Sequence, residues 1–320
     1  MPKKIDSLLI YNIAKYYYKD GLEQDAIANM VGISRSQVSR LLTKARSMGI
    51  VQFKLVYPVD TEYEDLAEEM KRYLGIDEVK IVPVDEEVVK KNEAHIGQAI
   101  AIYAAKYLPD LIMDAKVVGT GWGNTVYQSI LHMDHYAGSS DLLFVPLVGS
   151  VGQYAPCYQI NSIIDRISEK FKSKGMFINS PAYLDKERYG RLNEYKEKML
   201  PVMELWNKVD LAIIGLGKPL DKSDYLENEM DPVLLRRLRH ADIAGDILGQ
   251  FFHTDGSIHH IGEHYHLLGF DVAKLKYVEN VVCLCGGKDK ADGIVIAAQA
   301  GYFKTLITDS STAQLILERR

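Results

Sequence analysis

The 320-residue chain is poor in cysteine and has no long apolar run. Three cysteines are too few for the disulfide framework that stabilises small secreted domains. No apolar stretch reaches the roughly 18 residues that a membrane-spanning helix needs. The N-terminus, MPKKIDSLL, has two lysines but neither an apolar core nor a small-residue cleavage site. We therefore expect a cytoplasmic protein without a signal peptide or a membrane partner.

Two of the cysteines, Cys283 and Cys285, belong to the apolar segment VVCLC. A spacing of two residues puts both side chains on one face of a strand. The pattern favours a buried structural pair, and a metal or redox site is the alternative.

Charge is unevenly distributed along the chain. The net charge of −5 would by itself argue against a nucleic-acid-binding protein. Residues 1–58, however, contain nine Lys or Arg and four Asp or Glu, which leaves a net +5 there and −10 in the remainder. A basic N-terminal segment on an acidic body is attracted to phosphate while the body is not.

Residues 24–46, QDAIANMVGISRSQVSRLLTKAR, combine the features of two helices joined by a tight turn. Ile27 and Val31 are four residues apart and share one helical face. Ala28 is small enough to let two helices approach closely. Gly32 is the residue that most easily adopts a sharp turn. This combination is typical of a helix-turn-helix, and an ordinary helical hairpin with a solvated polar face is the alternative.

The second of these helices has a capping signal and a polar outer face. Ser34 and Gln37 form the S-x-x-Q capping box, and the apolar residues that follow lie on one stripe. In a DNA-reading helix-turn-helix, such a helix enters the major groove with its N-terminus. Arg35 and Arg40 then suit guanine or phosphate, and Gln37 suits adenine. We predict that the DNA-binding residues are Ser34, Arg35, Ser36, Gln37, Ser39, Arg40 and Lys44.

The chain is expected to fold as two domains. Residues 1–58 should form an all-α helix-turn-helix domain with a short strand or wing over 51–56. Residues 59–320 alternate strands with longer helices, which indicates a larger doubly wound α/β domain. Strands are expected at 79–84, 115–118, 142–148, 176–178, 211–216, 281–284 and 306–308. Helices are expected at 6–18, 61–74, 92–108, 124–131, 157–171, 192–206, 288–300 and 311–318. The helix 92–108 should end before Pro109. The secondary structure of the segments 230–238 and 243–248 is less clear from the sequence.

The segment 119–125, GTGWGNT, joins an expected strand to an expected helix. Its three alternating glycines leave backbone amides free to surround an anion at a helix N-terminus, and Thr120 and Thr125 add hydroxyls. The segment lacks the GK[ST] of a P-loop, and Asn124 stands where a dinucleotide-binding loop has its third glycine. A monophosphate fits best, and a simple tight turn is the alternative.

Three more glycine-rich loops, 148–153, 214–218 and 285–290, follow expected strands. Ligands of doubly wound sheets bind outside these carboxyl ends. The segment 245–253, GDILGQFFH, adds the carboxylate of Asp246, a strong acceptor for sugar hydroxyls, and the imidazole of His253. The histidines of HHIGEHYH at 259–266 match no standard zinc spacing, and a polar surface is favoured over a metal site.

Taken together, these segments resemble the SorC family of sugar-responsive bacterial transcription regulators over nearly the whole chain. The helix-turn-helix at 24–46 and GTGWGNT at 119–125 carry the resemblance. Four further motifs support it: PLVGSVG at 146–152, AIIGLG at 212–217, GDILGQFF at 245–252 and CGGKDKADGIVIAAQAGYFKTLITDSSTA at 285–313.

The resemblance implies an effector domain with the fold of sugar-phosphate isomerases, which binds a sugar or sugar phosphate and forms a dimer or tetramer on operator DNA. A phosphate would lie on 121–125 near Lys290, with Asp246 on the sugar hydroxyls. Val148 stands where some relatives carry a Schiff-base lysine, so covalent capture is not expected. The family's GRFFD is replaced by Gln250-Phe251-Phe252-His253, which changes a cation and an anion. The predicted effector-binding residues are Gly119, Thr120, Gly121, Trp122, Gly123, Asn124, Thr125, Gly149, Asp246, His253 and Lys290.

Three functions remain open from the sequence. The first is a transcription regulator controlled by a sugar or sugar phosphate, without a cofactor or metal. The second is a sugar-phosphate isomerase that uses Asp246 or His253 as general base. This alternative gives the basic helix-turn-helix no role, and fold does not imply function. The third is a structural DNA-binding protein with a vestigial effector pocket.

Overall fold

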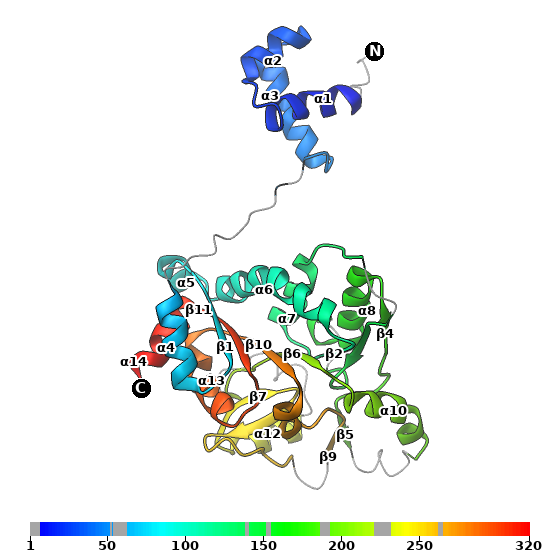
Figure 1. Cartoon of the computed structure of the whole chain (residues 1–320), viewed down its shortest axis with the longest axis vertical. Helices are drawn as coiled ribbons and strands as arrows, with labels where there is room; N and C mark the ends of the chain where they lie inside the picture. Colours follow the sequence, from blue (N-terminus) through cyan, green and yellow to red (C-terminus); the bar gives the residue numbers. More distant parts are fainter. Residues whose placement is uncertain are drawn as a thin grey trace. The chain divides into compact units, whose positions relative to one another are not determined.

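The computed structural model describes residues 7–51, 53, 63–137, 141–151, 155–185, 193–220, 232–261 and 265–320. Contacts between Cα atoms divide the chain into two compact units, Met1–Pro58 and Val59–Arg320 (Figure 1). Within the described ranges, no helix has both the length and the apolar character needed to cross a membrane.

The first unit contains three helices: α1 (Ser7–Tyr18), α2 (Gln24–Val31) and α3 (Arg35–Ser47). Helix α2 ends at Gly32, whose φ of 72° lies in the left-handed region that favours glycine. All three helices contribute buried apolar side chains to one core. The core residues are Ile10, Ile13, Ala14, Ile27, Ala28, Val38, Leu41, Leu42 and Ala45. The two helices predicted over 24–46 are confirmed, whereas the strand predicted over 51–56 lies mostly outside the described residues.

Helix α3 begins with the capping box that the sequence predicts. The Gln37 amide donates to Ser34 Oγ at 3.3 Å, and the Ser34 amide donates to Gln37 Oε1 at 2.9 Å. Two of the amide groups that a helix start leaves without partners are thereby satisfied.

Replacing Ser34 by alanine should destabilise the first unit by about 1 kcal/mol, because one capping acceptor is lost. The matched control is Ser39→Ala, a substitution at an exposed serine inside the same helix. Urea denaturation followed by circular dichroism measures both variants. Equal stability of the two would contradict the capping role of Ser34.

The second unit is organised on one parallel sheet with the strand order β1-β11-β10-β6-β2-β3-β4. The strands are β1 (Glu78–Val82), β2 (Val117–Thr120), β3 (Leu143–Pro146), β4 (Lys174–Gly175), β6 (Leu211–Gly215), β10 (Asn280–Leu284) and β11 (Thr305–Asp309). The central strands β2 and β6 are apolar and buried, as expected for strands covered on both faces. The predicted α/β class is confirmed.

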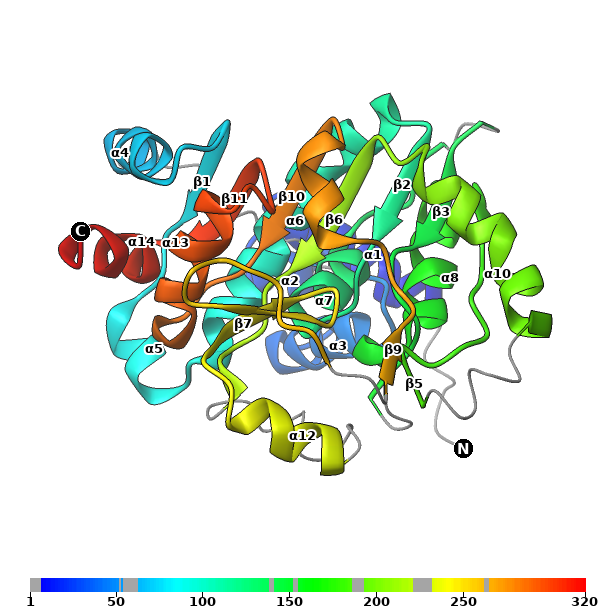
Figure 2. The ribbon, with the colours of Figure 1, turned by 90° about the horizontal axis from the view of Figure 1, so that it is seen from below.

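Helices cover both faces of this sheet (Figures 1 and 2). One face carries α6 (Ala94–Asp114), α7 (Asn124–His132) and α8 (Ile160–Phe171). The other carries α4 (Glu64–Leu74), α10 (Asn193–Trp206), α13 (Ala291–Gln299) and α14 (Ser310–Glu318). The core is therefore a three-layer arrangement with the sheet in the middle.

Smaller elements complete the second unit. Two antiparallel pairs are present: β7 (Ile243–Ile247) with β8 (Gln250–His253), and β5 (Tyr183–Asp185) with β9 (Tyr265–Leu267). The remaining elements are α5 (Glu86–Lys91), α12 (Pro232–Arg239) and the 3₁₀ turns η2 (Pro156–Tyr158), η4 (Val272–Tyr277) and η5 (Lys288–Lys290). The unclear segment 243–248 is thus a strand and its turn.

Two predicted boundaries are wrong. Helix α6 does not end before Pro109 but continues to Asp114. Proline removes one backbone donor, but Leu108 and Ile112 remain on the buried face, and their packing outweighs that loss. The strand predicted at 176–178 is instead the two-residue β4, because pairing with β3 involves Lys174 and Gly175.

The strand order reverses between β2 and β6. From β2 the chain continues outward to β3 and β4, whereas β6 pairs on the other side of β2 and is followed by β10 and β11. The connections after β2 and β6 therefore diverge to opposite faces. Such a switch point leaves a crevice outside the carboxyl ends of the strands, where ligands of doubly wound folds bind.

Candidate functional site

The first candidate site is the outer face of α3. All seven predicted DNA-binding residues, from Ser34 to Lys44, are exposed, while the apolar stripe of the same helix is buried in the core. Arg35 Nε lies 3.8 Å from Asp25 Oδ1, an exposed pair that is worth little. Gln37 differs from the expectation, because its Oε1 is already engaged by the Ser34 amide. A bidentate contact of Gln37 to adenine would therefore compete with the capping box.

The second candidate site is a cavity of about 300 Å³ at the β2–β6 switch point. Its wall combines the β2–α7 connection, the loop after β6, the β7–β8 hairpin and single residues from η2, β10 and η5. The lining residues are Trp122, Gly123, Asn124, Thr125, Val126, Tyr158, Gly215, Leu216, Gly217, Lys218, Asp246, Leu248, Leu284 and Lys290. This volume is at the lower end of small-molecule pockets and suits a small ligand.

The GTGWGNT segment supplies one wall of this cavity. Gly119 and Thr120 belong to the buried strand β2, and Gly121 follows at its end. The next residues turn into α7, which begins at Asn124 without a side-chain cap. Gly123 has a φ of 134°, which side-chain-bearing residues rarely adopt. The uncapped first amides of α7 give this wall a positive partial charge, which favours a bound anion.

Asp246 enters the cavity from the β7–β8 hairpin. The two-residue turn Leu248-Gly249 has φ values of 52° and 72°, the left-handed pair of a tight hairpin turn. Asp246 is 5% exposed, and its Oδ1 has no hydrogen-bond partner in the described part of the chain. Burial raises the pKa of Asp246 to about 6, against the lowering effects of Lys290 and the Gly249 amide. A buried acceptor without a partner is what a ligand hydroxyl would satisfy.

The loop after β6 is shaped around Asp246. The Gly217 amide donates to the Asp246 carbonyl at 2.9 Å. A methyl group on Gly217 would lie 1.8 Å from Asp246 Oδ1, so only glycine leaves the carboxylate in place. Gly121 is similarly restricted, since a methyl group there would lie 2.6 Å from Leu248 Cδ2.

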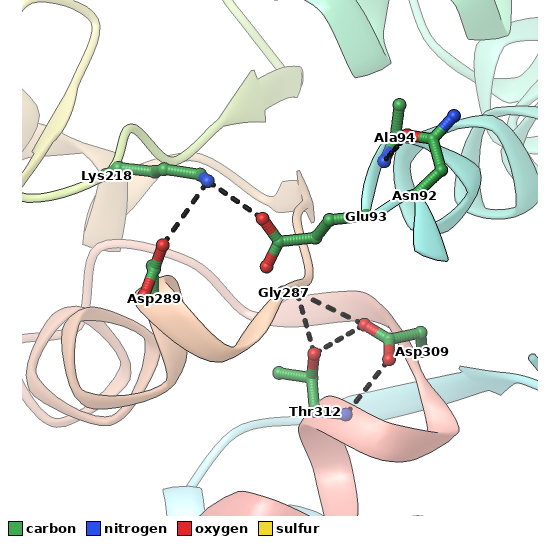
Figure 3. A network of polar contacts seen from close by, with 8 residues as sticks. All are labelled: Asn92, Glu93, Ala94, Lys218, Gly287, Asp289, Asp309 and Thr312. Atoms are coloured by element: carbon green, nitrogen blue, oxygen red, sulfur yellow. Dashed lines mark hydrogen bonds and ion pairs between the residues drawn. The ribbon is translucent and has the colours of Figure 1, made fainter. Parts of the chain in front are cut away.

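Two lysines complete the cavity. Lys290 is the last residue of η5, the turn that comes after β10, and Lys218 lies in the loop after β6. Lys218 Nζ lies 3.0 Å from Glu93 Oε2 and 3.4 Å from Asp289 Oδ2 (Figure 3). Burial lowers the pKa of Lys218, but its contacts with these two carboxylates outweigh that effect and raise it overall. Lys218 is therefore a charged ammonium group beside the cavity.

Five predicted effector residues do not line the cavity. Gly119, Thr120 and Gly121 are buried in β2 and at its end, behind the lining residues, and Gly149 and His253 lie elsewhere. The loop of Gly149 packs against Pro181, and its amide donates to Leu268 O at 3.0 Å. His253 is at the end of β8, where Nδ1 lies 3.0 Å from Asp242 O and Nε2 lies 3.1 Å from His259 Nδ1. Neither Gly149 nor His253 lines the cavity. His253 pairs with Ile243 at the end of the hairpin remote from its turn, which places it away from Asp246.

Sequence reasoning missed other lining residues. Tyr158, Val126, Leu248 and Leu284 carry no polar motif that would have indicated a site. Lys218 is the last residue of the glycine-rich loop 214–218, but nothing in that loop's sequence singles it out. The described residues contain no group of three or more potential metal ligands, and Cys283 and Cys285 are buried with Sγ atoms 3.6 Å apart.

Comparison with known proteins agrees with this architecture. Residues 61–318 match the family model Sugar-bind, "Putative sugar-binding domain". The sorbitol operon regulator of Klebsiella pneumoniae is 25% identical over 99% of this chain and 100% of its own length. The transcriptional regulator LsrR of Escherichia coli K12 is 26% identical over 96% of this chain and 94% of its own. The crystal structure of full-length SorC from Klebsiella pneumoniae matches with a TM-score of 0.74 and 25% identity, over 98% of this chain and 99% of that one. The chain therefore belongs to the SorC family of sugar-responsive bacterial transcription regulators.

Proposed function

We propose that the outer face of α3 binds operator DNA and that a sugar or sugar monophosphate in the switch-point cavity controls this binding. The observation that carries the proposal is the chemistry of the cavity. It combines the uncapped start of α7, two lysines and the unpartnered carboxylate oxygen of Asp246 within about 300 Å³. The first two features suit an anionic group, and the third suits a hydroxyl.

The proposal assigns DNA binding to residues 1–58, and effector binding and oligomerisation to 59–320, in a cytoplasmic dimer or tetramer. An effector that binds one arrangement of the subunits better shifts the protein towards that arrangement. A dimer would present two α3 helices to half-sites about 34 Å apart. The ligand thereby changes the spacing of the two helices without touching them.

The isomerase alternative is less well supported. It needs an acid and a base on the same substrate, but His253 does not share the cavity with Asp246. The relatives reported above are named as regulators. Turnover of pentose or hexosamine phosphates by the purified protein would nevertheless establish it.

The test measures operator affinity with and without a panel of sugars and sugar phosphates. Operator fragments are first selected from random DNA by the full-length protein. We expect at least one sugar or sugar phosphate to change the apparent Kd by about 5-fold to 150-fold, the usual range of allosteric coupling. If no compound changes either operator affinity or thermal stability, the vestigial-pocket alternative would be favoured.

Arg35→Ala and Arg40→Ala should each weaken operator binding by about 1–3 kcal/mol if the arginine reads a base. A phosphate contact would instead weaken binding uniformly and reduce its salt dependence. Arg72→Ala, which removes an exposed arginine from α4 of the second unit, controls for the change in total charge. Fluorescence anisotropy at physiological salt measures all three. Wild-type affinity in both α3 variants would refute the assignment of α3.

A further inference from the structure

A second cavity, of about 460 Å³, lies next to the switch-point cavity. It is bordered by α5, the start of α6, η5 and one side of α14 from Ser311 to Glu318. The turn η5 contributes to both, since Lys290 lines the first cavity and Lys288 lines the second. The two cavities are therefore neighbours that share one short turn.

The Lys218 bridge, formed by Lys218 with Glu93 and Asp289, joins these two cavities (Figure 3). Lys218 lines the first cavity and Glu93 lines the second. Lys218 and Glu93 are 125 residues apart in sequence and meet only through the fold. Their side chains are 32% and 35% exposed, so water screens the pair only in part.

The Glu93 side chain lies between the start of α6 and the loop that contains Gly287. It is the N-cap residue of α6, yet its side chain makes no capping hydrogen bond. Its Oε1 would be 3.2 Å from a methyl group on Gly287, so the Gly287 loop packs closely against it. The Gly287 amide donates to Thr312 Oγ1 at 2.7 Å and to Asp309 Oδ2 at 3.3 Å, and Asp309 caps α14. Figure 3 shows both sets of contacts, those of Lys218 with Glu93 and Asp289 and those that Gly287 makes with Asp309 and Thr312 at the start of α14.

The charge of the bridge decides which ligand would disturb it. Two carboxylates face one ammonium group, so Lys218 is already neutralised within the protein. A neutral sugar gains little from displacing them. A phosphate at the start of α7 carries up to two negative charges and competes for the same ammonium group. The helix dipole at the start of α6 offers the Glu93 carboxylate an alternative partner, which lowers the energy needed to release it.

We infer that Lys218 is an exchangeable anion-binding residue, and that an anionic group in the switch-point cavity draws it away from Glu93 and Asp289. The inference rests on the proposed function and concerns how the cavity would hold the anionic group of an effector. Breaking the Lys218 bridge costs free energy, and this cost weakens anion binding. The strength of the contacts with Glu93 and Asp289 sets its size. By reciprocity, anion binding loosens Glu93 and, with it, the loops at the starts of α6 and α14.

Inorganic phosphate is the probe for this inference, measured by isothermal titration calorimetry on the full-length protein. Glu93→Gln should tighten phosphate binding about fivefold, because it removes one competitor for Lys218. Asp289→Asn should act in the same direction. Lys218→Met should weaken binding, and the double variant E93Q/K218M should match K218M. Glu86→Gln, a substitution at an exposed carboxylate that lines the second cavity without contacting Lys218, controls for charge alone.

Two outcomes overturn the inference. In the first, E93Q and E86Q change phosphate affinity equally. In the second, E93Q still tightens binding when Lys218 is methionine. If phosphate binding is lost in Lys290→Met but is indifferent to Glu93 and Lys218, the inference fails and the proposed anion site stands. If the wild-type protein binds no phosphate and only an unphosphorylated sugar changes operator affinity, the inference fails and the proposed function stands. If neither a sugar nor a sugar phosphate changes operator affinity, both fail.

Discussion

Gly217→Ala should weaken the response to effector by about 10-fold to 100-fold while operator binding itself is retained. The new methyl group would occupy a point 1.8 Å from Asp246 Oδ1. The loop cannot move away easily, because the Gly217 amide is bound to the Asp246 carbonyl. The carboxylate must therefore rotate out of its position, and the ligand loses a charged acceptor worth about 1.5–3 kcal/mol.

Gly215→Ala is the matched control. Gly215 lies two residues earlier in the same segment and also lines the cavity, but its nearest atoms to a new methyl group are 3.7 and 3.8 Å away. These are ordinary van der Waals contacts, so the effector response should change by less than about threefold. The effector concentration at half-maximal change in operator affinity is the measurement. If G217A responds at the wild-type concentration, Asp246 does not contact the effector.

Local signals made the first unit predictable. The capping box of Ser34 and Gln37, the turn at Gly32 and the apolar stripe of α3 all act within a few residues. Each of them would favour the same conformation in an isolated segment. The start of α7 after GTGWGNT was predictable for the same reason, since glycines and a helix onset are visible in the sequence.

Contacts between distant segments made the rest of the site unpredictable. Nothing near Gly217 indicates that Asp246 fills the space where its side chain would be. Lys218 was visible as a lysine after glycines, but its neutralisation by Glu93 depends on the arrangement of β6 and α6. His253 was grouped with Asp246 by proximity in sequence, and the tight turn at Leu248-Gly249 separates them. Pro109 suggested a helix end, but tertiary packing of α6 overrode it.

Asp246→Asn should stabilise the protein at pH 8 by about 3 kcal/mol. The pKa of Asp246 rises from an ordinary 3.8 to about 6 in the folded chain because burial disfavours the charged form. The folded state therefore holds a proton more tightly than the unfolded state, and ionisation destabilises the fold. A shift of about two units corresponds to about 3 kcal/mol, which is fully present above pH 6. Asparagine cannot ionise and avoids this penalty.

The pH dependence of this gain distinguishes its cause. The difference in unfolding free energy between D246N and wild type should shrink as the pH falls through 6 and vanish only well below the ordinary pKa of 3.8, where the wild-type carboxyl is protonated in both states. Urea denaturation at pH 8 and pH 5 measures it, with Asp110→Asn on the exposed face of α6 as control. A gain that is equal at both pH values would mean that burial of the charge is not its source. The same variant should lose effector affinity, since an amide is a weaker acceptor than a carboxylate. Asp246 would then be a residue retained for ligand recognition at the expense of stability.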